Sequence, residues 1–291
     1  MIITQLIGGL GNQMFQYAAG RALALRHGTS LKVDTRGFEG YQLHQGFELQ
    51  RVFAGAFDVA SEADVRRVLG WRRSPTLRRL LGRLPTSWGS SRFAAEPHFE
   101  YWKGFEDLPA DCFLSGYWQS EKYFAAIADP LRADFAFRPP LEGLNHELSV
   151  RIKGVNAISM HVRRGDYASN PQTTATHGLS PPSYYAKAIS FMMDRVTNPH
   201  LFVFSDDMAW VKANLELAAP HTFVSHNRGL ESYNDMRLMS HCKHHIIANS
   251  SFSWWGAWLN PDAQKVVVAP KVWFARPINA EDLYIDGWHR L

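Results

Sequence analysis

Residues 158–167 read ISMHVRRGDY, a short apolar run that ends in charged and ionisable side chains. A run of this kind is typical of a buried strand, so the polar residues are expected where the strand leaves the core. An arginine guanidinium can donate two parallel hydrogen bonds to phosphate oxygens, and a neighbouring carboxylate can hold it in place. The stretch therefore indicates an anion site, with a purely structural knot of ion pairs as the alternative. The residues concerned are His161, Arg163, Arg164 and Asp166.

A second polar motif, GGLGNQ, lies between the first predicted strand and the first predicted helix. Glycine permits a sharp turn and a close approach to a ligand, and the free N–H groups of a helix start favour an anion. The motif is neither GxGxxG, because Met14 stands in place of the third glycine, nor a P-loop, because no GK[ST] follows. Gly11, Asn12 and Gln13 are candidate ligand contacts, and the two amides could bond sugar hydroxyls. A tight turn with an asparagine cap is the simpler alternative.

Two further motifs also follow predicted strands. LFVFSDD, residues 201–207, ends in two carboxylates that could bind a metal, read guanine N–H groups or ribose hydroxyls, or cap a helix. NSSFSWWGAWL, residues 249–259, places serine hydroxyls at a helix start, which suits a diphosphate but also an ordinary serine cap. The three tryptophans after these serines are expected in the core. The candidate residues are Ser205, Asp206, Asp207, Asn249, Ser250, Ser251, Phe252 and Ser253.

The elements that must position these motifs alternate between short apolar runs and helical patterns. Strands at residues 2–7 and 30–34 flank a helix at 12–27, and a longer alternating series begins near residue 157. Such alternation predicts doubly wound parallel sheets, with ligands at the carboxyl ends of the strands. We predict two α/β domains, residues 1–150 and 151–291, joined within 139–154. Residues 55–140 are helix-prone, without clean alternation.

The composition is that of an ordinary globular protein. The 291 residues are 46% hydrophobic and 20% charged, with a net charge of +4. Two distant cysteines give no disulfide framework, and the start shows neither a basic n-region nor a cleavage signature. No apolar run reaches the roughly 20 residues of a membrane span. We expect a cytoplasmic protein.

Two other stretches have ambiguous chemistry. Residues 241–245 contain three histidines and a cysteine, which are metal-ligand types, but histidine is also favoured at a helix C-terminus. Residues 66–95 contain eight arginines and no acid, and the leucines within 77–84 share a helical face. This basic amphipathic helix would either contact the inner membrane peripherally or be a solvated helix packed on its own domain.

Taken together, GGLGNQMFQYAAGRAL, HVRRGDY, FSDD and SSFSWWGAWL resemble the motif set of bacterial α-1,2-fucosyltransferases of glycosyltransferase family 11. The resemblance implies a GT-B fold, with two Rossmann-like domains facing across a cleft. It also implies GDP-β-L-fucose as the donor, inversion at the sugar carbon and no metal or other cofactor. The acceptor would be the 2-hydroxyl of a terminal β-galactoside, which could be lipid-linked, in a bacterial surface glycan such as O-antigen. The C-terminal domain would bind the donor and the N-terminal domain the acceptor.

The resemblance also assigns roles to the motif residues. Arg163 would hold the donor diphosphate with support from His161 and Arg164, and Asp206 or Asp207 would read guanine or ribose. The glycine-rich and serine-rich motifs would complete the donor site. Some relatives carry a glutamate in the loop after the arginine pair, whereas this chain has no acid between residues 167 and 193. Asp166 is then the general base or the organiser of the arginine pair, and Asp34 is the reserve candidate for the base. Alternatively, Asn12 orients the acceptor without a strong base.

Other functions remain open from the sequence. A fucosyltransferase of another linkage, or a transferase using another nucleotide sugar, would carry similar motifs. A nucleic-acid-binding module is a remote alternative that rests on the arginine-rich stretch at residues 66–92, but no nucleic-acid motif occurs. We therefore expect a nucleotide sugar and a glycan as partners, and no nucleic acid.

Overall fold

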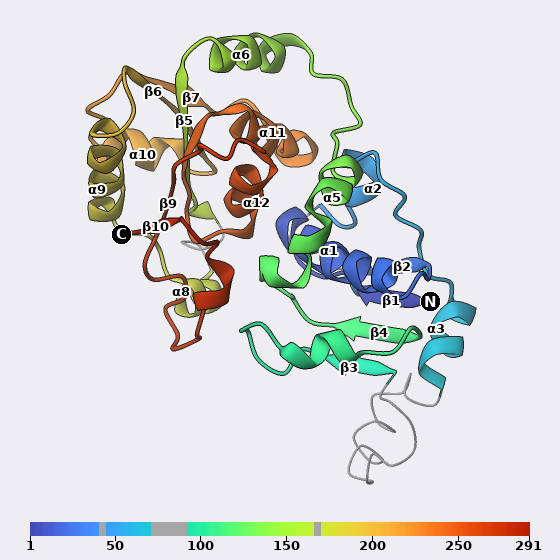
Figure 1. Ribbon diagram of the computed structural model, residues 1–291. Coiled ribbons are helices and arrows are strands. Elements are labelled where there is room, and N and C mark those ends of the chain that lie inside the picture. Colours follow the sequence, from blue (N-terminus) through green and yellow to red (C-terminus); the bar gives the residue numbers. More distant parts are fainter. Residues whose placement is uncertain (41–44, 71–91, 166–169) are drawn as a thin grey trace. The chain divides into compact units, whose positions relative to one another are not determined.

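The computed structural model describes residues 1–40, 45–70, 92–165 and 170–291, which form two compact α/β units (Figure 1). The first unit comprises Met1–Arg138 and Glu281–Leu283, and the second Pro139–Ala280 and Tyr284–Leu291. The division thus falls at the start of the predicted range 139–154 and before the expected boundary after residue 150. The reason is helix α6 (Gly143–Lys153), which buries Leu148 and Ile152 in the core of the second unit.

The first unit is built on a four-stranded parallel sheet in the order β2-β1-β4-β3. Helix α1 (Leu10–Arg26) connects β1 to β2, as predicted. Strands β3 and β4 lie in the segment for which the sequence indicated only helix, because runs of three or four residues show no periodicity. The strands are β1 (Ile2–Gln5), β2 (Leu31–Asp34), β3 (Phe93–Ala95) and β4 (Cys112–Ser115).

Short helices complete the first unit. They are α2 (Leu49–Val52), α3 (Glu62–Leu69) and α5 (Ala128–Asp134), with 3-10 turns η1 (Arg36–Phe38), η3 (Lys103–Asp107), η4 (Glu121–Tyr123), η5 (Ala125–Ile127) and η7 (Glu281–Leu283). The turn η7 comes from the C-terminal part of the chain, which rejoins the first unit at these three residues. It is held because Asp282 accepts the backbone N–H of Tyr101 at 2.8 Å and pairs with Lys122.

The second unit has a six-stranded parallel sheet in the order β10-β9-β8-β5-β6-β7. The chain runs outward from β5 to β7 on one side, then returns to β8 and runs outward to β10 on the other. The strand order therefore reverses between β5 and β8, and ligands of such sheets bind at the carboxyl ends beside this point. The strands are β5 (Asn156–Val162), β6 (Pro199–Ser205), β7 (His221–Val224), β8 (His244–Ile246), β9 (Val267–Ala269) and β10 (His289–Arg290).

Helices cover both faces of this sheet (Figure 1). Ile158 and Met160 of β5 pack against α9 and α10, whereas Ala157 packs with α6 and α11. This alternation follows from the two-residue period of a strand. The tryptophans of α12 (Trp254, Trp255 and Trp258) are buried, as expected. The helices are α8 (Pro171–His177), α9 (Pro182–Met193), α10 (Met208–Asn214), α11 (Tyr233–His241) and α12 (Ser251–Leu259), with the turn η6 (Gly229–Glu231).

In the ranges that the structure describes, no helix is both long enough and apolar enough to cross a membrane. The predicted basic helix at residues 77–84 lies outside those ranges. Helix α3 precedes this stretch in the sequence. Within α3, Arg66 forms an exposed ion pair with Glu62 at 2.7 Å.

Candidate active site

The carboxyl ends of β5 and β6 bring an arginine and an aspartate together. The parallel pairing places Val162 opposite Ser205, so the residues that follow the two strands are neighbours. Nη1 of Arg163 lies 2.7 Å from Oδ2 of Asp206. The other oxygen, Oδ1, accepts the backbone N–H of Arg164 at 2.8 Å. Asp206 therefore fixes both the guanidinium of Arg163 and the backbone turn that carries it.

Gly165 is required by this arrangement. A Cβ atom at this position would lie 2.6 Å from Oδ2 of Asp206, the same oxygen that pairs with Arg163. The contact is closer than a Cβ atom tolerates, so any side chain here would displace the carboxylate. The glycine in the HVRRGDY motif is thus explained by the close approach of Asp206.

Arg164 and Asp207 form a second pair beside the first. The guanidinium of Arg164 lies 3.8 Å from the ring centre of Trp210, and its Nε is 3.6 Å from Oδ2 of Asp207. Asp207 is also the N-cap of α10, accepting the backbone N–H of Trp210 at 3.0 Å. This confirms the helix-cap interpretation of Asp207. Ser205 donates to the carbonyl oxygen of Val162 at 2.8 Å and accepts the backbone N–H of Asp207, so its hydroxyl joins the two strand ends.

His161 is buried next to this cluster. Its ring centre lies 5.9 Å from that of Phe252 in the first turn of α12. Burial lowers the pKa of His161 to about 4; the nearby Asp206 opposes this shift and Arg163 adds to it. The imidazole is therefore neutral at physiological pH. Its buried Nδ1 has no hydrogen-bond partner among the described residues, and an unsatisfied buried polar atom of this kind is consistent with a ligand site.

The start of α12 follows β8, which pairs with β5 at the point where the strand order reverses. Ser250 is the N-cap and accepts the backbone N–H of Phe252 at 3.3 Å, which confirms the cap interpretation. The hydroxyl of Ser253 is buried and bonds the backbone of Ala248. Ser251 is half-buried at the first position of the helix. The N-terminus of this nine-residue helix thus lies beside the end of β5.

Asn249 has a structural role. Its amide donates to the carbonyl oxygens of His177 at 2.9 Å and Trp273 at 3.2 Å, and its oxygen accepts from Ser180. These bonds fasten the end of α8 and the segment after β9 to the start of α12. These hydrogen bonds do not support the prediction that Asn249 contacts the donor directly, which stays a prediction.

The glycine-rich motif belongs to the first unit. Gln13 is buried and its side-chain amide bonds backbone groups: it donates to the carbonyl oxygens of Gly8 and Gly46 and accepts the N–H of Glu48. Gln13 thus links the backbone of the glycine-rich turn to the segment at residues 46–48, and its buried amide is not exposed for a ligand contact. Asn12 is half-buried and accepts from Gln119 at 2.8 Å, and Gly11 precedes it in the first turn of α1.

Of the two candidate general bases, Asp34 and Asp166, only Asp34 lies in the described part of the chain. Asp34 is buried and accepts two hydrogen bonds from the Arg36 guanidinium, at 2.7 and 2.8 Å. Both of its oxygens are therefore engaged in an ion pair, which does not favour a role as a base. Asp166 lies outside the described residues, so its role stays a prediction.

One carboxyl at this edge of the second unit was not identified from the sequence. Asp235 lies in the first turn of α11, after β7, and accepts from the amide of Asn227 at 2.7 Å. Burial raises the pKa of Asp235 to about 7, against the opposing effect of the Asn227 hydrogen bond. The sequence shows that an acidic residue lies in a helix after a strand, which could have marked Asp235 as a candidate. The partial burial of its carboxyl group depends on the fold and could not be predicted.

The described residues contain no group of three histidine, cysteine or acidic side chains that could hold a metal ion. The candidates at residues 241–245 have other partners. Ring nitrogens of His241 and His245 pair with Ser149 and Ser159 at 2.8 and 2.9 Å, and that of His244 with the backbone N–H of Val266 at 3.0 Å. Burial raises the pKa of the Cys242 thiol.

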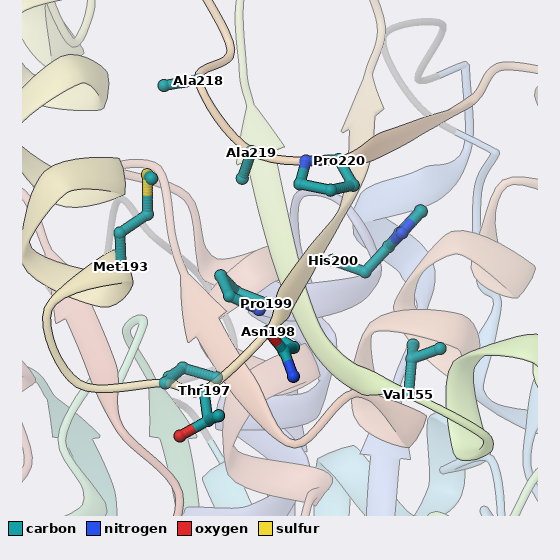
Figure 2. A pocket seen from close by; sticks show the side chains of 10 residues that line it. Val155, Met193, Thr197, Asn198, Pro199, His200, Ala218, Ala219 and Pro220 are labelled. Atoms are coloured by element: carbon teal, nitrogen blue, oxygen red, sulfur yellow. The ribbon is translucent and has the colours of Figure 1, made fainter.

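A cavity of about 450 Å³ lies at the opposite, amino-terminal edge of the second sheet (Figure 2). Its walls come from Met193 of α9, the segment 197–200 at the start of β6, and the segment 218–220 before β7. It is lined by no acidic or basic side chain apart from His200, whose pKa is lowered by burial. Its position and lining do not suit the charged chemistry of the strand tips, so we do not assign it to the active site.

The same architecture occurs in solved transferase structures. The crystal structure of NodZ alpha-1,6-fucosyltransferase soaked with GDP-fucose matches with a TM-score of 0.53 and 16% identity, over 89% of this chain and 92% of that one. Another, of fucosyltransferase NodZ from Bradyrhizobium, matches with a TM-score of 0.54 and 14% identity over the same shares. At such identities the likeness concerns the fold. It confirms the predicted α/β fold of the GT-B type, the fold of a large class of glycosyltransferases.

The particular family follows from the sequence comparisons. The model of glycosyl transferase family 11 matches residues 99–291, and the chain belongs to that family, as its motifs predicted. It is 37% identical to the alpha-1,2-colitosyltransferase of Escherichia coli, over 100% of this chain and 99% of that protein. It is 34% identical to the O-antigen biosynthesis glycosyltransferase WbnK of Escherichia coli, over 98% and 99%. The galactoside 2-alpha-L-fucosyltransferase SEC1 of Bos taurus is 25% identical, over 87% of this chain and 62% of that protein.

Proposed function

We propose that this glycosyltransferase moves L-fucose from GDP-β-L-fucose to the 2-hydroxyl of a terminal β-galactoside, with inversion and without a metal ion. The observation that carries the proposal is the Arg163–Asp206 pair at the reversal point of the second sheet. The names of the relatives supply the sugar chemistry: one is an alpha-1,2-colitosyltransferase and another a galactoside 2-alpha-L-fucosyltransferase. A third is named for O-antigen biosynthesis, which suggests a bacterial surface glycan as the acceptor.

The chemistry of sugar transfer explains why these residues are needed. As C1 of the sugar separates from the donor oxygen, the sugar gains oxocarbenium character and negative charge accumulates on the diphosphate. Without a metal, fixed cations and dipoles must stabilise that charge, and they do so best when already held in place. Asp206 holds Arg163 in place. The N-terminus of α12 adds N–H groups and the positive end of a helix dipole.

The same geometry suggests how the nucleoside is bound. Asp206 and Asp207, expected to read guanine or ribose, are already engaged by the arginines and by the cap of α10. Asp235 is the better candidate, because its half-buried carboxyl group has neither an arginine nor a helix cap as its partner in the described residues, and a carboxylate can accept the adjacent N1–H and N2–H groups of guanine. The neutral imidazole of His161 would form a further hydrogen bond to the donor.

A second candidate function is colitosyl transfer, favoured by the 37% identity to the colitosyltransferase over the whole chain. L-Colitose lacks the 3-hydroxyl of L-fucose and is otherwise the same sugar, so both donors would present the same diphosphate and base to the site. The distinction would therefore lie in contacts to one hydroxyl of the donor sugar.

The two candidates are separated by one activity assay. The enzyme is incubated in EDTA with lactose and either GDP-fucose or GDP-colitose, and the product linkage and anomeric form are determined by NMR. We expect α-1,2-linked product from one GDP-sugar at a rate that added Mg²⁺ or Mn²⁺ does not change. Transfer that requires the metal, or that uses only UDP- or ADP-sugars, would contradict the proposal.

The predicted membrane contact is tested separately, because residues 71–91 lie outside the described ranges. If the basic stretch binds a membrane that carries a lipid-linked acceptor, the protein should sediment with anionic vesicles and not with neutral ones. Equal sedimentation with both would remove the membrane proposal.

A further inference from the structure

The loop that joins β7 to α11 contains one buried side chain, and that side chain is polar. In the segment at residues 225–231, Asn227 has only 8% of its surface exposed, whereas the other six residues are exposed. The apolar residue of this segment, Leu230, is 55% exposed and does not anchor it. The loop is therefore held at Asn227 by hydrogen bonds and not by apolar packing.

Asn227 forms a reciprocal pair with Asn145, which lies in the first turn of α6. Nδ2 of Asn145 donates to Oδ1 of Asn227 at 2.9 Å, and Nδ2 of Asn227 donates to Oδ1 of Asn145 at 3.0 Å. The second hydrogen of the Asn227 amide goes to Oδ1 of Asp235 at 2.7 Å. The opposite orientation of this amide would set its oxygen against the carboxylate oxygen. The three side chains therefore define a single arrangement.

Asn145 is itself a fixed support, because α6 is fastened against α11. Leu148 and Ile152 of α6 belong to the core that also contains residues of α11. Between them, Oγ of Ser149 lies at hydrogen-bond distance from Nδ1 of His241, at 2.8 Å. The helix that begins the second unit thus carries the partner of Asn227, and its packing determines where that partner lies.

This network fixes the direction of the Asp235 carboxylate without using up its acceptor capacity. Oδ1 accepts from Asn227, whereas in the described part of the chain no donor is bonded to Oδ2. Each carboxylate oxygen has two lone pairs, so Oδ1 can accept a second hydrogen bond as well. Two parallel acceptors match the adjacent N1–H and N2–H groups of guanine. Adenine and uracil do not present two adjacent donors of this kind.

We propose that Asn227 and Asn145 are positioning residues that turn the carboxylate of Asp235 toward the nucleobase of the donor. In this way α6 contributes to the base specificity of the enzyme through Asn145, which acts on Asp235 through Asn227. The inference rests on the proposed function for the identity of the nucleotide as a guanosine diphosphate.

The test compares GDP with inosine diphosphate, which lacks only the 2-amino group of guanine. Calorimetry measures the dissociation constants of both nucleotides for the whole protein in EDTA at pH 8. Burial raises the pKa of Asp235 to about 7, so its carboxyl group is mostly ionised at this pH. The variants are Asn227→Ala and Asn145→Ala, and Asp235→Asn measures the complete loss of the carboxylate.

Asn156→Ala is the matched control. Asn156 begins β5 at the opposite, amino-terminal edge of the same sheet, and its amide also joins separate segments of the second unit. It donates to the carbonyl oxygen of Thr197 at 2.6 Å and accepts from Lys243 at 2.9 Å. Its loss should therefore cost stability without affecting the base. Urea unfolding of every variant is measured in parallel.

We expect the wild type and Asn156→Ala to bind GDP about tenfold more tightly than inosine diphosphate, because a hydrogen bond to a charged group is worth at least about this factor. In Asn227→Ala and Asp235→Asn the preference should fall to about threefold or less. Asn145→Ala should give an intermediate value, since Asn227 keeps its bond to Asp235 but loses the partner that orients it. A purely structural role would lower stability and leave this ratio unchanged.

An unchanged preference for GDP in Asn227→Ala would overturn the proposal and leave the proposed function intact. So would an unchanged preference in Asp235→Asn, because another group would then read the base. If Asn227→Ala does not fold, Asn145→Ala decides in the same way, because its side chain is only half-buried. Failure of the proposed function is distinguishable: the wild type itself would then bind GDP no more tightly than ADP or UDP.

Discussion

Replacing Arg163 by alanine should reduce kcat/KM by about 10² to 10³. The arginine is the cation that Asp206 holds at the end of β5, with Nη1 of Arg163 2.7 Å from Oδ2 of Asp206 and about a quarter of each side chain exposed. Two unit charges about 4 Å apart interact by about 4 kcal/mol at an effective dielectric constant of about 20. This is the size of effect found when one preorganised donor to a developing negative charge is removed, about 2.7–4 kcal/mol.

The effect on stability should be much smaller. Asp206 in the variant still accepts the backbone N–H of Arg164, and its exposed quarter can be hydrated. We therefore expect the free energy of unfolding to fall by no more than about 1 kcal/mol. Arg163→Lys retains the charge but not the planar fork, so it should recover only part of the lost activity.

The assay is steady-state transfer from the GDP-sugar to lactose, with urea unfolding of each variant measured in parallel. Arg21→Ala is the matched control, because Arg21 forms a 2.9 Å ion pair with Asp134 at similar exposure in the first unit. It should cost similar stability and change kcat/KM less than threefold. Activity of Arg163→Ala within threefold of the wild type would refute the assignment of Arg163 to the diphosphate.

Three further predictions test the surroundings of the site. Gly165→Ala should displace Asp206, because the new Cβ would lie 2.6 Å from its Oδ2, and should lower kcat/KM at least tenfold, whereas Gly154→Ala, with its nearest contacts at 3.6 Å, should not. Burial lowers the pKa of His161 to about 4, while an unfolded histidine titrates near 6.5. The unfolded chain then binds the proton first, so stability falls as pH drops through this window, by about 2 kcal/mol between pH 7 and 5. Urea unfolding of His161→Asn at both pH values should lack this contribution, and an equal loss in the variant would contradict the buried neutral state. Asp207→Ala removes the cap of α10 and should lower the free energy of unfolding by about 1 kcal/mol while GDP binding, measured by calorimetry, persists; complete loss of GDP binding would show a direct contact instead.

The sequence predicted the alternation of strands and helices and the place of the polar motifs, because both depend on local patterns. It indicated that Arg163 follows a buried strand, and the structure confirms this. It did not predict that Asp206 is the partner of Arg163 or that Trp210 lies against Arg164, because these contacts depend on the pairing of β5 with β6 across about forty residues. The hydrogen bonds that Glu96 accepts from the backbone after β4 were equally hidden, since β3 is too short to show a period.

The central claim is that the second unit holds a guanosine diphosphate sugar without a metal. It is tested most directly by thermal unfolding of the whole protein in excess EDTA, alone and with GDP, ADP or UDP. A nucleotide at about 100 times its dissociation constant adds roughly 2.7 kcal/mol to the free energy of unfolding. We predict this stabilisation with GDP and little with ADP or UDP. A shift that appears only when EDTA is replaced by Mg²⁺, or one equal for all three nucleotides, would contradict the account.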